Sequence, residues 1–247
     1  MSKARLTTLI VLLLAVLGCS GAARAVALFE GLANLSLTLQ SINGGPTIPT
    51  GVSIDYSAGI FDKYTDTYGA ASATATETLA PGAVLVPMAI GGTLQQSVRV
   101  SGQAGEGAGY STSLVQTTGL ILIENLSNDA ITLSFVYSFT ASVEALIALT
   151  GFDATAGAGW FLTDDLGLVN LGDAIFADAL LGPTTNFLSL SGTLELELNS
   201  GESDTLLSQV DTNGFAEAPE PPVAALLISG LLGAAATRPI RRTRRAA

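Results

Sequence analysis

Residues 131–141 alternate between apolar and polar side chains, and this pattern restricts the fold of the chain more than any other feature of its sequence. Every odd position of the segment Ile-Thr-Leu-Ser-Phe-Val-Tyr-Ser-Phe-Thr-Ala is apolar, and four of the five even positions are Ser or Thr. A period of two places alternate side chains on opposite faces of a β-strand. The segment is therefore predicted to be a strand of an antiparallel sheet, with one face against a core and the other in water.

The same alternation recurs at both ends of the central region. Leucine occupies every second position of 35–39 and again of 194–198, with polar residues between. The unbroken apolar run 119–123 predicts a central strand that is covered on both faces. Turns rich in Gly, Pro and Asn separate these runs. Many short strands and no convincing amphipathic helix predict an all-β fold, an antiparallel β-sandwich or jelly roll.

We expect this β domain to occupy residues 26–211 and a linker to occupy 212–218. The small, Thr-rich segment 70–78 is expected to form a strand edge. Residues 173–181 contain acceptable helix formers and are expected to form either one short helix or a loop.

The residue types that the chain lacks exclude several classes of enzyme. It contains no histidine and a single cysteine, Cys19. Ser-His-Asp triads, Cys-His dyads, cysteine-rich zinc sites and disulfide scaffolds are therefore excluded. We expect no catalytic residue, no metal and no cofactor, and the composition favours a protein that is not an enzyme.

The charges are distributed unevenly along the chain. The formal net charge is −11, yet eight of the ten basic residues lie in the two terminal segments. Residues 26–221 hold all 21 carboxylates and only Lys63 and Arg99, a net charge of −19. So acidic a surface disfavours nucleic acid and anionic lipid, which require Lys and Arg to neutralise phosphate.

The first 25 residues have the three parts of a secretory signal peptide. Two basic residues precede the apolar run 6–17, and small residues follow it. Ala23 and Ala25 occupy the −3 and −1 positions of an Ala-x-Ala cleavage site. We therefore expect the secretion machinery and signal peptidase to produce a mature chain that begins at Val26.

This segment has two alternative interpretations. A retained membrane anchor is disfavoured, because the apolar run is shorter than the roughly 20 residues that span a bilayer as a helix. The sequence Val-Leu-Gly-Cys that ends at Cys19 loosely resembles a bacterial lipobox. Acylation of Cys19 would make the protein a lipoprotein, and this alternative stays open.

The C-terminal segment 219–247 has a pattern of its own. The motif Pro219-Glu220-Pro221 precedes an uncharged run over 223–236, and the chain ends with an arginine cluster made up of Arg238, Arg241, Arg242, Arg244 and Arg245. An apolar helix followed by arginines is a stop-transfer signal, which leaves the cluster in the cytoplasm and the acidic domain outside. The 14 apolar residues would span about 21 Å as a helix, so snorkelling arginines and local thinning must close part of the gap.

This arrangement resembles the PEP-CTERM sorting signal of Gram-negative bacteria. The resemblance covers residues 219–247, the Pro-Glu-Pro motif, the single apolar helix and the Arg-rich tail. It implies that exosortase, an integral-membrane cysteine protease, recognises the segment and cuts near the motif. It also implies transient anchoring in the inner membrane, followed by transfer to the cell surface or the exopolysaccharide matrix.

Carboxylates and tyrosines occur together in residues 55–68. Asp62, Tyr64 and Asp66 are the candidate ligand surface, with Asp55, Tyr56 and Tyr68 nearby in the sequence. Tyrosines beside carboxylates are compatible with a sugar-binding or Ca²⁺-assisted surface. The alternative is an ordinary solvated strand.

Two pairs of carboxylates and one tryptophan are further candidates. Glu195 and Glu197 lie about 7 Å apart if they share one strand face, near the separation of an inverting glycosidase, but the solvent face of an alternating strand is the favoured explanation. Asp164 and Asp165 form either a cation site, half of a carboxylate pair, or a turn in contact with water. Trp160, the single tryptophan, is expected in the core rather than on a stacking platform.

The sequence therefore predicts an exported protein of the cell surface or extracellular matrix with a structural or adhesive role. A carbohydrate-binding module is the alternative, and it requires an exposed aromatic row on one sheet face. A glycoside hydrolase acting on exopolysaccharide is a weaker alternative, and it requires two carboxylates that converge in a cleft. Exopolysaccharide is thus a candidate partner, and nucleic acid is not.

Overall fold

The structure, a computed structural model, describes residues 26–105, 108–147, 152–180 and 182–218. The predicted signal peptide (1–25) and sorting signal (219–247) lie outside the described residues. The described residues form eleven strands: β1 (Ala27–Ile42), β2 (Val52–Tyr68), β3 (Ala71–Ala80), β4 (Val86–Pro87), β5 (Thr93–Ala104), β6 (Gly109–Asn125), β7 (Ile131–Ile147), β8 (Asp153–Asp164), β9 (Asn170–Asp178), β10 (Thr184–Leu198) and β11 (Ser203–Ala218). Within these ranges the chain contains no helix that could cross a membrane.

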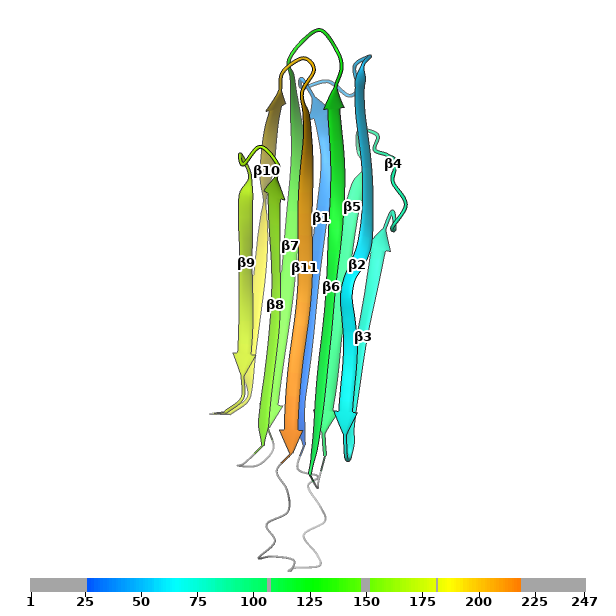
Figure 1. The fold of residues 1–247 in the computed structure, drawn as a ribbon. Coiled ribbons are helices and arrows are strands. Elements are labelled where there is room, and N and C mark those ends of the chain that lie inside the picture. The colour runs from blue at the N-terminus through cyan, green and yellow to red at the C-terminus, as the bar shows by residue number, and fades with distance from the viewer. Residues whose placement is uncertain (1–25, 106–107, 148–151, 181, 219–247) are drawn as a thin grey trace, which may run out of the picture.

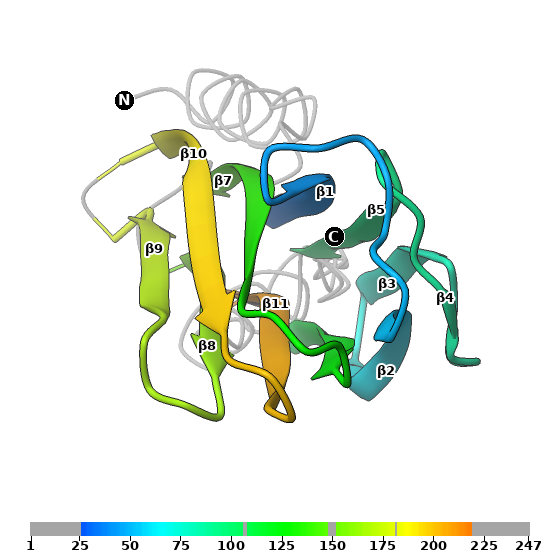
Figure 2. The ribbon, with the colours of Figure 1, turned by 90° about the horizontal axis from the view of Figure 1, so that it is seen from above.

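The strands form two antiparallel sheets that pack face to face, which confirms the predicted all-β fold (Figures 1 and 2). The five-stranded sheet has the order β10-β7-β1-β5-β3, and the six-stranded sheet has the order β4-β2-β6-β11-β8-β9. The hydrophobic core lies between them and draws residues from both sheets. Segment 70–78, expected at a strand edge, falls largely within β3, the outermost strand of the five-stranded sheet.

The strands are much longer than the short strands expected from the sequence. Six of them contain 15–17 residues, namely β1, β2, β6, β7, β10 and β11. At about 3.3 Å per residue, a 16-residue strand extends roughly 53 Å. The sandwich is consequently elongated along the strand direction (Figure 1).

The alternating segments lie where the pattern predicts. In β7 the odd residues face the core, and Leu133, Phe135 and Phe139 are fully buried. The leucines of 35–39 in β1 and of 194–198 in β10 are buried in the same way. Trp160 also lies in the core, 5.3 Å from the ring of Phe139 between centroids, as expected.

The segment 119–123 is an exception, because it is not covered on both faces. Ile121 and Ile123 face the core, whereas Leu120 and Leu122 lie half-buried on the outer face of the six-stranded sheet. The apolar run reflects an outer face that is itself partly apolar, and no second layer covers it in the described structure.

Two secondary-structure assignments predicted from the sequence are wrong. Residues 173–178 belong to strand β9 rather than to a helix or a loop, and residues 212–218 are the second half of β11 rather than a linker. The inward positions of that half of β11 are small, Thr212, Gly214, Ala216 and Ala218, so the sequence shows no large apolar alternation there. All four are nevertheless buried, so the domain includes every residue up to Ala218.

The small residues of β11 accommodate a large side chain from the facing sheet. Phe29 of β1 is 2% exposed, and its ring lies where a Cβ atom on Gly214 would be. Gly102 of β5, beside Phe29 in its own sheet, is equally close to the ring. The two glycines therefore create the space that Phe29 fills.

The middle of the sandwich also contains a buried polar network. The Gln96 amide donates to Thr117 Oγ1 at 3.1 Å and accepts from Ser208 Oγ at 2.6 Å. Thr117 Oγ1 in turn donates to the Val210 carbonyl at 3.3 Å. These bonds join β5 to β6 and β11 and satisfy polar groups whose burial would otherwise cost free energy.

We expect Gly214→Ala to lower the free energy of unfolding by about 1–3 kcal/mol, because the added methyl group overlaps the Phe29 ring and overpacks the core. Gly59→Ala is the matched control: a Cβ atom at Gly59 of β2 meets nothing within 4 Å. That variant should stay within about 0.5 kcal/mol of the wild type. Urea denaturation of the two variants measures the difference, and equal stabilities would contradict the proposed packing of Phe29.

Candidate functional site

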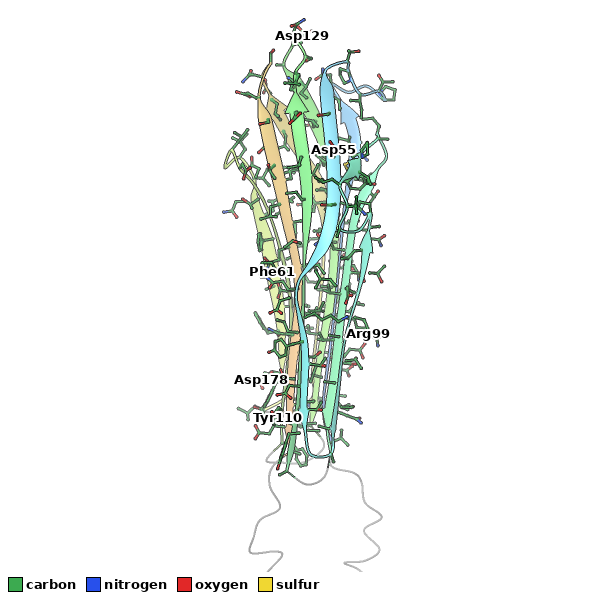
Figure 3. All side chains as sticks on the ribbon, turned by 45° about the vertical axis from the view of Figure 1, so that its right-hand side comes forward. Asp55, Phe61, Arg99, Tyr110, Asp129 and Asp178 are labelled. Atoms are coloured by element: carbon green, nitrogen blue, oxygen red, sulfur yellow. The ribbon has the colours of Figure 1, made fainter. Side chains whose placement is uncertain are left out.

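A β-bulge in β2 decides which side chains face outward near one end of the sandwich. The register between β2 and β6 shifts between Ile60 and Asp62, so Phe61 is the extra residue (Figure 3). Before the bulge, even positions such as Ile54 and Ala58 face the core. After the bulge, odd positions face inward and even positions face outward, because Lys63 pairs with the buried Val115 and Asp62 pairs with the outward Gln116. One inserted residue thus turns the following even positions to the outer face.

The three predicted ligand residues share one face of β2 because a strand has a period of two, and the bulge turns that face outward. Asp62, Tyr64 and Asp66 lie at successive outward positions of β2, and all are exposed. Tyr68 continues the row and stacks on Tyr110 of β6, with ring centroids 6.1 Å apart. Asp55 and Tyr56 do not join this group: they lie before the bulge, where they pair with β4.

Tyr110 is held in place by Asp66. Its hydroxyl donates to Asp66 Oδ2 at 2.8 Å. This hydrogen bond and the charge of the carboxylate raise the pKa of Tyr110 above its usual value, because both favour the protonated phenol. The Tyr110 ring therefore occupies a defined position on the outer face.

A hollow of about 330 Å³ lies on the same outer face, over β8, β9 and β11. Gly157 and Gly159 of β8 form its floor, and the phenyl rings of Phe161 and Phe176 form part of its wall. Asp211 and Asn213 of β11 supply its polar groups. Phe176 is 67% exposed, and a Cβ atom on Gly157 would lie 3.0 Å from the nearest atom of its ring.

Two aspartates line this hollow, Asp173 of β9 and Asp211 of β11, and Asp211 points outward beside Gly159. Burial raises the pKa of Asp211 above the usual value for an aspartic acid. No hydrogen bond or ion pair joins its carboxylate to another group among the described residues. A half-buried carboxylate without a partner is a favourable place for a positively charged or hydrogen-bond-donating ligand.

These residues lie on one surface, which we call the aromatic face. It consists of selected outward residues of the six-stranded sheet, from its middle to the end that holds Ala218: Asp62, Tyr64, Asp66, Tyr68, Tyr110, Phe161, Phe176, Asp211 and Asn213. Sequence analysis found only the β2 part of it. The residues of the hollow were missed because 170–178 was not recognised as a strand, although the spacing of Gly157 and Gly159 was a signal for a shared strand face.

The aromatic face carries acidic side chains and, in the described part of the chain, no basic one. Lys63 points to the opposite side of β2 and pairs with Glu77 at 2.6 Å. Arg99 lies on the outer face of the other sheet and pairs with Glu30 at 2.7 Å. The negative charge of the aromatic face is therefore uncompensated by side chains of its own sheet.

The other predicted carboxylates have different surroundings. Glu195 and Glu197 are exposed neighbours on the outer face of β10, the last strand of the five-stranded sheet. Asp164 does not meet water as a turn residue would: it is 7% exposed and accepts the amides of Leu168 and Val169 at 3.1 and 2.8 Å. Among the described residues, no three acidic side chains, histidines or cysteines are placed to hold a metal ion.

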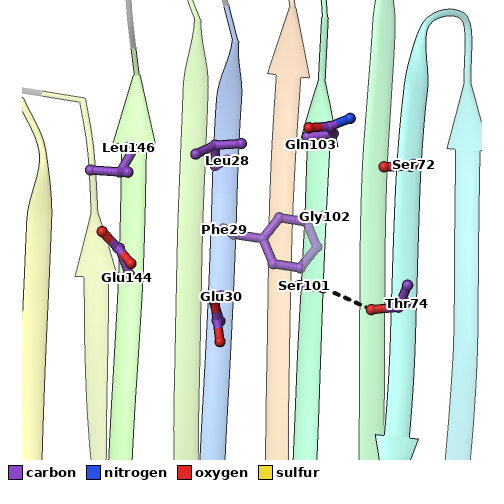
Figure 4. Close-up of a pocket in the computed structure, with 10 residues that line it drawn as sticks. All are labelled: Leu28, Phe29, Glu30, Ser72, Thr74, Ser101, Gly102, Gln103, Glu144 and Leu146. Carbon is purple, nitrogen blue, oxygen red and sulfur yellow. Dashed lines mark hydrogen bonds between the residues drawn. The ribbon is translucent and has the colours of Figure 1, made fainter.

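A second hollow, of about 290 Å³, lies on the outer face of the five-stranded sheet (Figure 4). Glu30 of β1 and Glu144 of β7 are direct cross-strand neighbours at its rim. Thr74 and Ser101 flank them and share a hydrogen bond of 2.7 Å. Because Glu30 already binds Arg99, this hollow offers one unpartnered glutamate and no exposed aromatic wall.

Comparisons with known proteins do not identify the chain. No protein-family model matches it, and no curated protein matches it. A solved structure described as a β-galactosidase from Bacteroides fragilis aligns at 11% identity over 70% of this chain and 28% of that one, with a TM-score of 0.11. The β-glucuronidase 2 of Bacteroides uniformis aligns at 12% identity over 72% and 22% of the two chains, with a TM-score of 0.12. Similarity at this level carries no information on fold or function.

Deleting Phe61 tests the role of the bulge. The deletion should turn Asp62, Tyr64 and Asp66 away from the outer face, break the Tyr110–Asp66 hydrogen bond and return the pKa of Tyr110 toward about 10. Spectrophotometric titration of the tyrosines measures this change. Phe61→Ala is the control, since it keeps the extra residue and removes only an exposed side chain. A Tyr110 titration that is unchanged by the deletion would contradict this account.

Asp204 provides a test of stability against pH. It is 3% exposed, and burial, with a further contribution from the charge of Asp164, raises its pKa. A raised pKa means that the folded state holds its proton more tightly, so this stabilisation is present at low pH and is lost as the pH rises through the folded-state pKa. Asp204→Asn keeps the carbonyl oxygen that accepts the Thr205 amide and removes the buried charge.

We therefore expect Asp204→Asn to have a melting temperature above that of the wild type at pH 7, by a few degrees at most, with the difference shrinking toward pH 4. Calorimetry at several pH values measures it. Glu195→Gln, an exposed carboxylate made neutral, is the control and should show no such trend. A difference that grows toward low pH would show that the sign is wrong.

Proposed function

We propose that this protein is exported and becomes part of the cell surface or extracellular matrix, where it has a structural or adhesive role. Its C-terminal segment is a sorting signal that an exosortase-type protease removes. The observation that carries this proposal is the pairing of residues next to both processing motifs. Ala27, two residues after Ala25, pairs with Ala104, and Ala218, which precedes Pro219, pairs with Gly109, so cleavage at either predicted site leaves every described strand intact.

The position of the two domain ends supports the same proposal. Ala27 pairs with Ala104 at the end of β5, and Ala218 pairs with Gly109 at the start of β6. Because β5 and β6 are consecutive, both ends of the domain lie at the same end of the sandwich (Figure 1). A chain anchored through residues 223–236 would thus carry the domain end-on, with the turns at 43–51 and 126–130 farthest from the membrane.

The domain itself is suited to a structural or adhesive role. It is an elongated sandwich of long paired strands, and both hollows described above are open features of sheet faces. The aromatic face favours the second candidate, a carbohydrate-binding module, because it presents exposed aromatic rings on one sheet. The hydrolase alternative is not proposed, since Glu195 and Glu197 lie on one exposed strand rather than on two walls of a cleft.

Intact-mass measurement of the protein released by the producing cell tests the sorting proposal. The released chain should begin at Val26 and end between Pro219 and Pro221, because cleavage before Ala218 would remove part of a paired strand. Glu220→Ala should leave the chain in the membrane fraction. Glu217→Ala, which neutralises an exposed carboxylate only three residues away, is the matched control and should be released normally.

Two results would contradict this proposal. A released chain that retains Arg241–Arg245 would exclude removal of the C-terminal segment. A diacylglyceryl group on Cys19 would establish the lipoprotein alternative instead, because the mature chain would then begin at that residue.

A further inference from the structure

We propose that the aromatic face binds an extended polysaccharide chain that carries free amino groups. This inference rests on the proposed adhesive role and specifies the ligand of that role. It depends on three observations. Aromatic and polar side chains align in rows across five strands, and one of these rows passes a hollow whose base is formed by glycine. The face also carries no compensating positive charge among the described residues.

The strand register places these side chains in two adjacent rows that cross the sheet. One row runs from Phe176 through Gly157 and Asn213 to Leu114 and Tyr64. The next row runs from Ala174 through Gly159 and Asp211 to Gln116 and Asp62. Four strand spacings of about 4.8 Å separate the two ends of a row, roughly 19 Å in all. The rows therefore form a track for an extended ligand that crosses the strands, and the first row has an aromatic ring at each end, Phe176 and Tyr64.

The hollow brings the ligand close to the protein at one point of this track. The Phe176 ring packs over Gly157, whereas Gly159 presents backbone rather than side chain, so a sugar ring can approach the sheet at Gly159, beside Phe176. The apolar face of a sugar packs on an aromatic ring, and its hydroxyl groups form hydrogen bonds with amide side chains such as Asn213 and Gln116 and with the carboxylate of Asp211. A peptide strand, by contrast, binds a sheet through the unpaired backbone groups of an edge, and the backbone of β6, β8 and β11 is already paired.

Charge determines which polysaccharide fits. The outward carboxylates of this sheet include Asp62, Asp66, Asp211 and Glu217, and Asp211 is half-buried without a partner. A uronic or sulfated chain would be repelled, whereas an ammonium group would neutralise Asp211 and interact favourably with the faces of nearby aromatic rings. The ligand class that satisfies both the aromatic track and the charge is a chain of amino sugars with free amines.

Calorimetric titration of the full-length protein, purified in an uncharged detergent, tests the inference. The probes are a glucosamine hexamer with free amines, the same hexamer fully N-acetylated, an alginate hexamer and a hexalysine peptide. We expect the glucosamine hexamer to bind most tightly, with an affinity that falls as salt is added. We expect the N-acetylated hexamer to bind at least tenfold more weakly, and the alginate hexamer not to bind.

Matched variants locate the site. Asp211→Asn removes the central charge and Phe176→Ala removes an aromatic wall, and each should weaken binding of the glucosamine hexamer by about tenfold. Glu195→Gln and Phe187→Ala are the controls, because Glu195 and Phe187 are exposed on the outer face of the other sheet, Phe187 at 69% against 67% for Phe176. Both controls should bind within twofold of the wild type. Phe176→Leu, which keeps an apolar side chain without a ring, replaces Phe176→Ala if that variant does not fold.

Three outcomes would overturn the inference: no binding of the glucosamine hexamer, equal binding of hexalysine, or equal losses in the control variants. Equal binding of hexalysine would show that the face is only a non-specific acidic surface. Because the assay uses purified protein, its outcome does not depend on export or processing. A failure here is thus distinguishable from a failure of the sorting proposal, which the mass of the released chain decides.

Discussion

Phe29 extends from the five-stranded sheet into a space that Gly214 leaves open in the six-stranded sheet. This contact illustrates the constraint on which the structure depends: two sheets of long strands pack at a fixed separation of about 10 Å, so a large residue on one inner face requires a small one opposite. The pairing explains why β11 is rich in small inward residues. It also explains why β11 remains a strand as far as Ala218, where its alternation of large apolar residues has already ended.

The same constraint gives the bulge at Phe61 its importance. Inward positions of a long strand must keep facing the core, and a single extra residue exchanges the two faces for all positions that follow. In β2 this exchange occurs where the strand leaves the apolar part of the core, so polar residues take both faces. Lys63 then joins β2 to β3 through Glu77, while Asp62, Tyr64 and Asp66 turn outward beside Tyr110. A packing irregularity thus assembles part of a candidate binding face.

Sequence patterns predicted the elements whose inner faces are large and apolar, and failed where the inner face is small. Leu133, Phe135 and Phe139 identified β7 because their burial follows directly from hydrophobic periodicity. Ala216 and Ala218 are just as buried, but alanine does not distinguish a strand from a linker. The candidate site was found in part for a similar reason: Asp62, Tyr64 and Asp66 are close in sequence, whereas Phe176 and Asp211 meet only through the register of three strands, which no local pattern specifies.

Burial raises the pKa of two aspartates in this domain, and their surroundings separate a structural role from a binding role. Asp204 is almost inaccessible, yet backbone amides of Asp165 and Thr205 donate to its carboxylate, so the protein itself offsets part of the cost of burial. Asp211 has a half-buried carboxylate on an outer face, with no protein donor among the described residues. Retaining such a group costs stability unless something outside the domain interacts with it. That uncompensated carboxylate, rather than the larger number of fully solvated acidic residues, is the strongest reason to place a ligand on the aromatic face.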